Sequence, residues 1–238
     1  MSSTSLPYKT ALVTGASRGI GRAIALRLAD LGCNLVLLAR NEALLEEVTQ
    51  AAQARGVEAV SLAGELTDES YFDAALAKAH SCFDFIDVLV NNAGTALHQP
   101  AQDADVSKWR KVMDLNFHAV VSLCERTLPA MIDAKRGAVV NISSISARNS
   151  SAGSGVYCAT KHALNGFTEC MYEDVRDYGI KVSSIMPGFV ATDLTDGMGL
   201  NAGHMISPND VADSVQYILS ASASACPTEI VLRPQLRP

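Results

Sequence analysis

Two side chains four residues apart, Tyr157 and Lys161, form the most promising chemical pair in the sequence. They fall in a stretch whose apolar spacing predicts a helix over residues 155–178, so they lie on the same face of that helix. A free phenol has a pKa of about 10 and is a poor base at neutral pH. A neighbouring ammonium favours the phenolate, and we therefore expect a pKa for Tyr157 below that ordinary value. The pair predicts general acid–base chemistry, with Tyr157 as the group that moves the proton.

Polar and small residues accompany this pair at the ends of predicted strands. They are Asn91, Asn92, Ala93 and Gly94 after the fourth strand, Ser143 and Ser144 after the fifth, and Pro187 and Gly188 after the sixth. Asn116 stands in the middle of a predicted helix, where a polar amide needs a reason. Open parallel sheets bind ligands at the carboxyl ends of their strands. We therefore expect these residues to gather around Tyr157.

The first predicted strand leads into a glycine-rich turn, TGASRGIG at positions 14–21, and a helical stripe follows directly. Glycines let the backbone turn sharply and approach a pyrophosphate closely, and the helix amino terminus offers unpaired N–H groups and partial positive charge. The order strand, glycines, helix predicts a dinucleotide site. Its candidate residues are Gly15, Ser17, Arg18, Gly19, Ile20 and Gly21.

The end of the second strand indicates which dinucleotide is bound. NAD sites usually place an acidic residue there to accept a hydrogen bond from the ribose 2′-hydroxyl, but this chain has Ala39 followed by Arg40. Arg18 in the glycine turn can reach the same place. Two guanidinium groups suit a 2′-phosphate, which leads us to expect NADP(H) as the cofactor. The alternative is that Arg40 is a solvated residue at the start of a helix.

Short apolar runs alternate with helical stripes along the whole chain. Strands are predicted at residues 11–14, 35–39, 58–62, 88–91, 138–142, 181–185 and 229–232. Helix caps are predicted at Asn41, Thr67, Ser107 and Ser207, with Gly32 and Gly56 ending the first two helices. This pattern predicts an α/β fold, a doubly wound, seven-stranded parallel sheet with helices on both faces (the Rossmann fold). We expect one domain over residues 1–238, with residues 1–8 disordered and residues 192–206 forming a loop over the substrate.

Composition narrows the class of protein further. The net charge is −6 and no basic cluster occurs, so nucleic acid is not an expected partner. No apolar run is long enough to span a bilayer, and residues 1–9 contain no stretch that could act as a signal peptide. The six cysteines lack zinc-ligand spacing with the five histidines, which predicts no metal site. We expect buried or semi-buried thiols in a reducing, cytoplasmic compartment.

Together these motifs resemble the short-chain dehydrogenase/reductase family in its single-domain form. The resemblance runs from about residue 9 to residue 232 and rests on five ordered features: TGASRGIG at 14–21, NNAG at 91–94, Asn116, the set Ser144, Tyr157 and Lys161, and PGFVAT at 187–192. The carboxyl-terminal segment 228–234 lacks the common glycine-rich ending. It resembles instead a branch that includes hydroxy-amino-acid and general carbonyl reductases.

The resemblance implies roles for the matching residues. Ser144 would hold the substrate oxygen, Tyr157 would transfer the proton, and Lys161 would bind the nicotinamide ribose and lower the tyrosine pKa. Asn116 would anchor a helix kink and a water on the proton path. The remaining cofactor contacts would come from Glu65, which stands where an aspartate is common, and from Leu66, Asn92, Ala93, Gly94, Pro187, Gly188, Val190 and Thr192. Ser143 would support this set from behind.

The expected activity is NADP-dependent hydride transfer to a carbonyl, or from a secondary alcohol, of a small or medium, partly apolar substrate. Two alternatives stay open: reduction of a 3-oxoacyl thioester, for which Arg148 is one basic residue near the site mouth, and a non-catalytic NADP(H) sensor. We also expect a homodimer or homotetramer formed by helices 107–134 and 155–178. The apolar residues Val120, Phe167 and Met171 support this, although an ordinary internal core would use them equally well.

Overall fold

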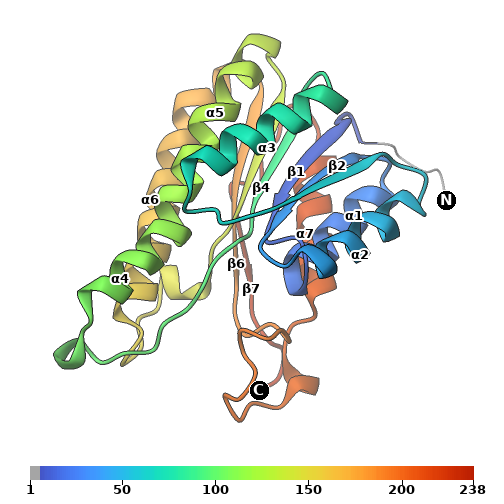
Figure 1. Cartoon of the computed structure of the whole chain (residues 1–238). Helices are drawn as coiled ribbons and strands as arrows, with labels where there is room; N and C mark the ends of the chain where they lie inside the picture. The colour runs from blue at the N-terminus through green and yellow to red at the C-terminus, as the bar shows by residue number, and fades with distance from the viewer. Residues whose placement is uncertain (1–5) are drawn as a thin grey trace.

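A computed structural model of the chain describes residues 6–238, and its centre is a sheet of seven parallel strands (Figure 1). Their spatial order is β3-β2-β1-β4-β5-β6-β7. The strands are β1 (Thr10–Thr14), β2 (Asn34–Ala39), β3 (Ala59–Ala63), β4 (Val88–Asn91), β5 (Gly137–Ile142), β6 (Ile180–Pro187) and β7 (Glu229–Leu232). The chain winds outward from β1 to β3, returns to β4, and winds out again to β7. This confirms the predicted doubly wound Rossmann fold.

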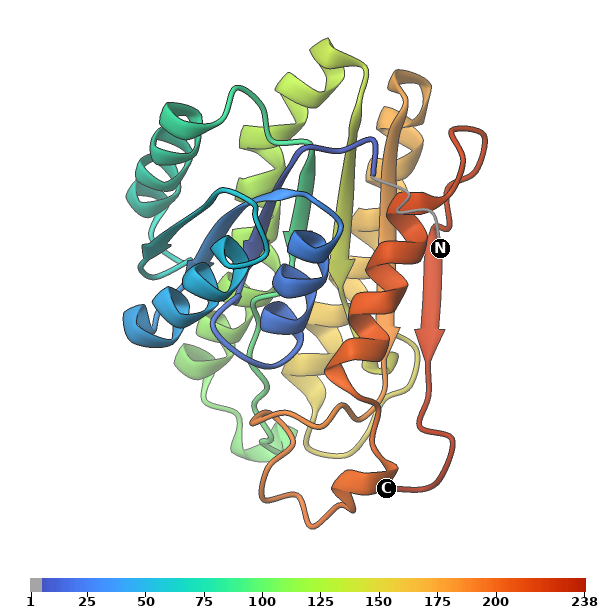
Figure 2. The same ribbon diagram turned by 90° about the vertical axis from the view of Figure 1, so that its right-hand side faces the viewer.

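Helices cover both faces of the sheet (Figures 1 and 2). They are α1 (Gly19–Asp30), α2 (Glu42–Gln53), α3 (Glu69–Cys82), α4 (Val106–Met113), α5 (Ala119–Ala134), α6 (Gly155–Val175) and α7 (Pro208–Ser220). Successive strand residues point to opposite faces, so Val13 packs in the core beneath α1, α2 and α7, while its neighbour Leu12 packs beneath α3, α5 and α6. Two apolar cores therefore hold the sheet between two helical layers.

The predicted strands match the observed ones closely. The fourth and seventh have the predicted bounds, and the others differ by one or two residues at an end. The largest difference is in β6, which continues to Pro187 because β5 and β7 flank it and every one of its residues is buried. A carboxyl end at Pro187 places the following Gly188 at the same edge of the sheet as the ends of β1, β4 and β5.

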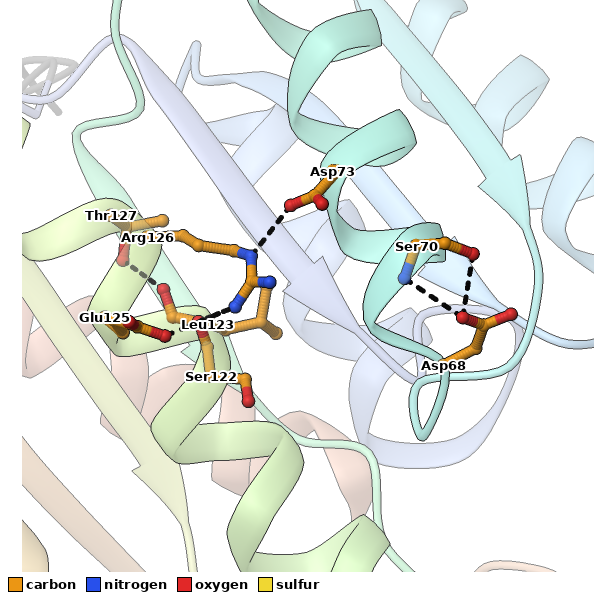
Figure 3. Close-up of polar contacts among 8 residues, drawn as sticks. All are labelled: Asp68, Ser70, Asp73, Ser122, Leu123, Glu125, Arg126 and Thr127. Carbon is orange, nitrogen blue, oxygen red and sulfur yellow. Dashed lines mark hydrogen bonds and ion pairs between the residues drawn. The ribbon is translucent and has the colours of Figure 1, made fainter.

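Two of the four predicted helix caps are correct. Asn41 accepts a hydrogen bond from the backbone N–H of Leu44 at 3.0 Å, and Ser207 forms a reciprocal capping box with Asp210. The cap of α3 is Asp68 rather than Thr67, and the cap of α4 is Asp105 rather than Ser107 (Figure 3 shows Asp68 and Ser70). In both cases a carboxylate takes the capping position, where its negative charge also complements the helix dipole.

Arg126 ties α5 to α3 on one side of the molecule (Figure 3). Its Nε lies 3.0 Å from Oδ1 of Asp73, and its guanidinium carbon lies 5.8 Å from the ring centroid of Phe72. The Arg126 side chain is mostly buried between the two helices, so its aliphatic part adds packing to the ion pair. This contact fixes two helices that share the same face of the sheet.

The amino-terminal segment is more ordered than predicted. Residues 1–5 of the segment expected to be disordered lie outside the described residues, but Tyr8 is buried in the core beneath α1 and α7. The buried carboxylate of Asp87 accepts hydrogen bonds from the backbone N–H groups of Lys9 and Thr10, both at 2.9 Å. The prediction of disorder is therefore wrong for Tyr8, because the sheet holds the chain that leads into β1.

Several expectations from composition can be compared with the described part of the chain. All six cysteines are free, but Cys82 and Cys170 are exposed, so the expectation that every thiol is buried or semi-buried is wrong for these two. Within residues 6–238 no helix has the length and apolar character to cross a membrane, and no cluster of histidine, cysteine, aspartate and glutamate could hold a metal ion. The 192–206 loop carries only a short 3₁₀ turn at Ala202–His204.

Candidate active site

The glycines of the turn between β1 and α1 are tightly packed against neighbouring atoms. Gly19 has a φ of +54°, a conformation that favours glycine, and a Cβ there would lie 3.2 Å from Cγ2 of Thr192. A Cβ on Gly21 would lie 2.2 Å from the carbonyl oxygen of Gly15, so only glycine allows the helix to start this close to the turn. Helix α1 has no side-chain cap at Arg18, which leaves its amino-terminal N–H groups for a ligand.

A large cleft, which we call the glycine-turn cleft, opens beside this turn with a volume of about 700 Å³. Most of the predicted cofactor residues line it: Gly15, Ser17, Arg18, Gly19, Ile20, Arg40, Glu65, Leu66, Asn92, Ala93, Gly94 and Thr192. Gly21 does not line the cleft, because it is buried under the turn, where its role is packing. Leu115, Asp193 and Leu194 also line the cleft and were not predicted as cofactor contacts.

Thr14 and Asn92 join the glycine turn to the segment after β4. The Thr14 hydroxyl oxygen accepts hydrogen bonds from the backbone N–H groups of Asn92 and Ala93, both at 3.0 Å. The Asn92 side chain donates to the carbonyl oxygen of Thr14 at 2.9 Å. The amide of Asn92 therefore shapes the cleft wall by holding two loops together. Sequence reasoning missed Thr14, because its role depends on a segment 78 residues away.

Both arginines expected to bind a 2′-phosphate line the cleft, and each faces a carboxylate. Arg18 forms an ion pair with Asp193, and Nη1 of Arg40 lies 3.9 Å from Oε2 of Glu65. The two arginine side chains are 62% and 67% exposed, so both can turn toward a ligand. Glu65, which was expected to contact the cofactor, lines the cleft with its carboxylate near Arg40.

A second, smaller cavity of about 90 Å³, which we call the tyrosine pocket, continues from the cleft. Residues shared by both cavities are Ile20, Asn92, Gly94, Thr95, Thr192 and Leu194. The tyrosine pocket adds Ile142, Ser143, Ser144, Tyr157, Lys161, Pro187, Gly188 and Val190. A ligand in the cleft can therefore extend into the tyrosine pocket, past the carboxyl ends of β4, β5 and β6.

Ser144 and Tyr157 present hydroxyl groups to this pocket. The Ser144 hydroxyl oxygen accepts a hydrogen bond from the backbone N–H of Ser146 at 3.1 Å, which leaves its own proton free to donate. Burial raises the pKa of Tyr157, and the neighbouring Ser144 hydroxyl acts in the opposite direction. The predicted lowering of this pKa is therefore wrong for the protein by itself, because burial removes hydration from the phenolate and is the largest cause of the shift.

Lys161 lies beside Tyr157, as the four-residue spacing predicts. Its Nζ is 5.8 Å from the centroid of the Tyr157 ring and donates a hydrogen bond to the carbonyl oxygen of Ile142 at 2.9 Å. The side chain is buried, and burial lowers the pKa of its ammonium to about 8. Lys161 therefore keeps its charge at neutral pH and has further N–H donors available beyond the one that binds Ile142.

Asn116 lies at a break in the predicted helix 107–134. That segment consists of α4, a π-helical turn at Asp114–His118, and α5. The Asn116 amide forms two hydrogen bonds with the backbone of Thr95, both at 2.8 Å: it accepts from the N–H and donates to the carbonyl oxygen. It also donates to Oγ1 of Thr160 at 3.1 Å. Asn116 is buried and lines neither cavity, so it holds Thr95 and the Tyr157 helix from behind.

Ser143 has an unexpected position. It is 4% exposed, lines the tyrosine pocket, and its hydroxyl has no hydrogen-bond partner within the described part of the chain. A buried hydroxyl without a partner is costly, but its oxygen is shielded from solvent, so Ser143 forms part of the pocket wall. The uncapped start of α1 and the close glycine packing make the cleft suitable for a dinucleotide, and the cleft continues into the pocket that holds Tyr157.

The fold and the site indicate an oxidoreductase, and comparison with known proteins identifies its family. The family model described as short chain dehydrogenase matches residues 9–202, and the chain belongs to this family. The predicted family is therefore confirmed.

The chain is similar to proteins of comparable length. It is 33% identical over 226 residues to an uncharacterized oxidoreductase of Staphylococcus epidermidis, covering 95% of this chain and 97% of that protein. It is 32% identical to an uncharacterized oxidoreductase of Staphylococcus aureus strain MW2, covering 97% and 99%. A metagenomic short-chain oxidoreductase solved in complex with NADP superposes with a TM-score of 0.86 at 34% identity, covering 98% of this chain and 100% of that one.

Proposed function

We propose that the protein reduces a carbonyl group of a small or medium substrate to a secondary alcohol, with NADPH as the reductant. The observation that carries this proposal is the meeting of Ser144, Tyr157 and Lys161 in one pocket that continues from the glycine-turn cleft. Their nearness to the cleft matters, because a cofactor bound there would reach these three groups. The family establishes an oxidoreductase, and the direction, cofactor and substrate class are our proposal.

Each residue of the tyrosine pocket has a chemical task in this reaction. A bound nicotinamide cofactor would supply the hydride. The Ser144 O–H donates a hydrogen bond to the substrate oxygen and stabilises the negative charge that develops there. Tyr157 donates its proton to the same oxygen, and its raised pKa keeps that proton in place at neutral pH. The protonated Lys161 donates to the cofactor ribose and balances the charge left on Tyr157.

Burial holds Tyr157 in the protonated form that the reductive direction uses. Oxidation of an alcohol needs Tyr157 as a base, and burial disfavours its phenolate. Reduction of a carbonyl needs the neutral phenol, which is the form that burial favours. The pocket is therefore better prepared to donate a proton than to accept one.

The arginines support NADP(H) over NAD(H). Arg18 and Arg40 line the cleft, and neither position carries the acidic residue that would bind a free ribose 2′-hydroxyl. Residues that would hold the cofactor elsewhere include the α1 amino terminus, Gly94 and Thr192. The metagenomic relative binds NADP, which agrees with this proposal.

The other two functions have less support. The hydroxyl groups and ammonium gathered in the tyrosine pocket would be unnecessary in a protein that only senses NADP(H). For a 3-oxoacyl thioester the relevant basic residue is Arg148, and its guanidinium already forms an ion pair with Glu229. The apolar residues of the 192–206 loop, including the half-exposed Leu194 and Met198, favour a partly apolar substrate instead.

A substrate screen tests the proposal. Purified protein is supplied with NADPH, and in parallel with NADH, and the loss of reduced-nicotinamide absorbance is followed across small ketones, β-keto esters and 3-oxoacyl thioesters. We expect turnover of one or more free carbonyl compounds, faster with NADPH. Binding of NADPH without turnover of any compound would favour the sensor, and turnover confined to thioesters would favour the acyl alternative.

A further inference from the structure

The glycine turn and the 192–206 loop touch at two successive residues. Arg18 and Asp193, which both line the glycine-turn cleft, form an ion pair although they are 175 residues apart in the sequence. Beside them, Thr192 lies against Gly19, where an added Cβ would be 3.2 Å from Cγ2 of Thr192. The cofactor side of the site and the start of the loop are therefore in direct contact.

The loop also has anchors away from the cleft, the first of them near its start, where the Thr195 hydroxyl donates to the carbonyl oxygen of Val190 at 2.7 Å. At its base, Ala191 and Ile206 pair through a backbone hydrogen bond of 2.9 Å, and at its far end Nδ1 of His204 binds the carbonyl oxygen of Arg237 at 2.7 Å (Figure 2 shows the carboxyl terminus beside the loop). Between these anchors, Met198 is 53% exposed and Gly197 has a positive φ. Within residues 6–238, the Arg18–Asp193 pair is the ion pair that joins this loop to the cleft.

Charge makes this contact sensitive to the nucleotide. The charged residues that line the cleft are Arg18, Arg40, Glu65 and Asp193, so each guanidinium already has a carboxylate nearby. A phosphate monoester carries nearly two negative charges and accepts two parallel hydrogen bonds from a guanidinium, whereas the exposed pair with Asp193 is weak. A phosphate beside Arg18 would also repel the Asp193 carboxylate. The two anions cannot both bind the same N–H edge of the guanidinium.

We propose that Asp193 is a specificity-determining residue of the nucleotide site: its carboxylate competes with the 2′-phosphate of NADP(H) for Arg18, and losing that contact removes one anchor from the start of the 192–206 loop and increases its mobility. This inference rests on the proposed NADP(H) function. Asp193 weakens the binding of 2′-phosphorylated nucleotides and leaves the binding of NADH unchanged. It also makes the position of the loop depend on which nucleotide is bound.

Calorimetric titration with NADPH and NADH tests the competition. Asp193→Asn should tighten NADPH binding about two- to fivefold, the range expected for loss of one exposed ion pair, with no change for NADH. The matched control is Asp196→Asn, because Asp196 is exposed in the same loop and forms no ion pair or side-chain hydrogen bond in the described part of the chain. It should leave both affinities unchanged.

The outcomes separate this inference from the function on which it rests. A wild-type protein that binds NADH as tightly as NADPH overturns both. A wild-type protein that prefers NADPH, combined with an Asp193→Asn variant whose NADPH affinity is equal or weaker, overturns the role of Asp193 alone. An equal gain in the Asp196→Asn variant also overturns it, because general loss of negative charge would then explain the result.

Hydrogen exchange of the loop amides tests the release. The probes are adenosine 2′,5′-bisphosphate and AMP, which lack the nicotinamide that would cover the loop. In the wild type, the bisphosphate should accelerate exchange over residues 192–201 and AMP should not. In Asp193→Asn the same amides should exchange faster from the start and respond to neither nucleotide. Equal exchange with both probes in the wild type would overturn the proposed release.

Discussion

At the scale of single residues, burial sets the protonation of Tyr157 and Lys161. The same loss of hydration raises the pKa of Tyr157 and lowers that of Lys161 to about 8, so neutral phenol and ammonium coexist at neutral pH. These are the forms in which one group donates a proton and the other donates hydrogen bonds. The spacing of the pair is visible in the sequence, but its burial is a property of the folded pocket.

The pH dependence of reduction follows from Lys161. Its pKa in the folded protein is lowered to about 8, so its positive charge is nearly complete at neutral pH and is lost as the pH rises through that value. We predict that kcat/KM for carbonyl reduction is level near neutrality and falls above about pH 8. Lys161→Arg, which keeps its charge at alkaline pH, should lower the rate but remove that alkaline fall. An alkaline fall unchanged in the arginine variant would assign it to another group.

Cofactor choice is also a residue-scale property. Arg40→Asp removes a guanidinium from the cleft and places a carboxylate where a 2′-phosphate would lie. We predict a loss of NADPH affinity of about ten- to a hundredfold, the value of one charge-assisted contact, and a preference shifted toward NADH. Arg40→Gln should give an intermediate loss without the shift toward NADH. Retention of the NADPH preference in Arg40→Asp would exclude Arg40 as its determinant.

The site residues that could be predicted are those whose role follows from their neighbours in the sequence. The four-residue spacing of Tyr157 and Lys161 and the place of Ser144 at a strand end predict their common location, and all three line one pocket. Thr95 and Asp193 were not predicted, because their partners Asn116 and Arg18 come from distant segments. Such pairings arise from the fold and leave no periodic pattern along the chain.

At the scale of elements, the break between α4 and α5 shows the limit of pattern reasoning. Apolar spacing predicts one helix over 107–134, but a π-helical turn at Asp114–His118 interrupts it. A π turn shifts the hydrogen bonding by one residue over a short stretch, which apolar spacing does not reveal. At this turn the amide of Asn116 is buried and hydrogen-bonds both the N–H and the carbonyl oxygen of Thr95. The amide was recognisable as unusual and the family resemblance implied a kink at Asn116, but apolar spacing did not reveal the π-helical turn.

Glycine packing in the first turn gives a stability prediction for this element. A Cβ at Gly21 would meet the carbonyl oxygen of Gly15 at 2.2 Å, so Gly21→Ala must displace α1 from β1. We predict a loss of about 1–3 kcal/mol in the free energy of unfolding, measured by urea denaturation, together with weaker nucleotide binding. The matched control is Gly166→Ala in α6, where an added Cβ meets nothing within 4 Å. Its helix propensity should raise stability by about 0.5–1 kcal/mol.

At the scale of the whole molecule, the sheet was the most predictable feature. Alternation of apolar strands and helical stripes predicted all seven strands and their parallel arrangement, because burial on both faces requires continuous apolar runs. Helix caps were less predictable. The starts of α3 and α4 each have two polar residues that could cap the helix, and in both the aspartate is the cap. The exact end of a helix depends on which of several nearby polar residues caps it, whereas the presence of a helix or strand depends on the apolar residues that it buries.

Assembly into a homodimer or homotetramer stays a prediction. Of the three apolar residues that suggested it, Val120 and Met171 are buried within the chain itself and Phe167 is partly buried. The family resemblance still leads us to expect an oligomer. Light scattering coupled to size exclusion should give a mass of two or four times 25.2 kDa. A mass equal to one chain over a range of concentrations would contradict the expectation.

The most direct test of the account is a comparison of nucleotide binding and turnover in Tyr157→Phe. This change removes the phenolic O–H and keeps the ring that packs beside Lys161. If Tyr157 is the proton donor, the variant binds NADPH with nearly the wild-type Kd and loses about 10²–10⁴-fold in kcat for carbonyl reduction. A variant that binds NADPH normally and retains wild-type kcat would contradict the account.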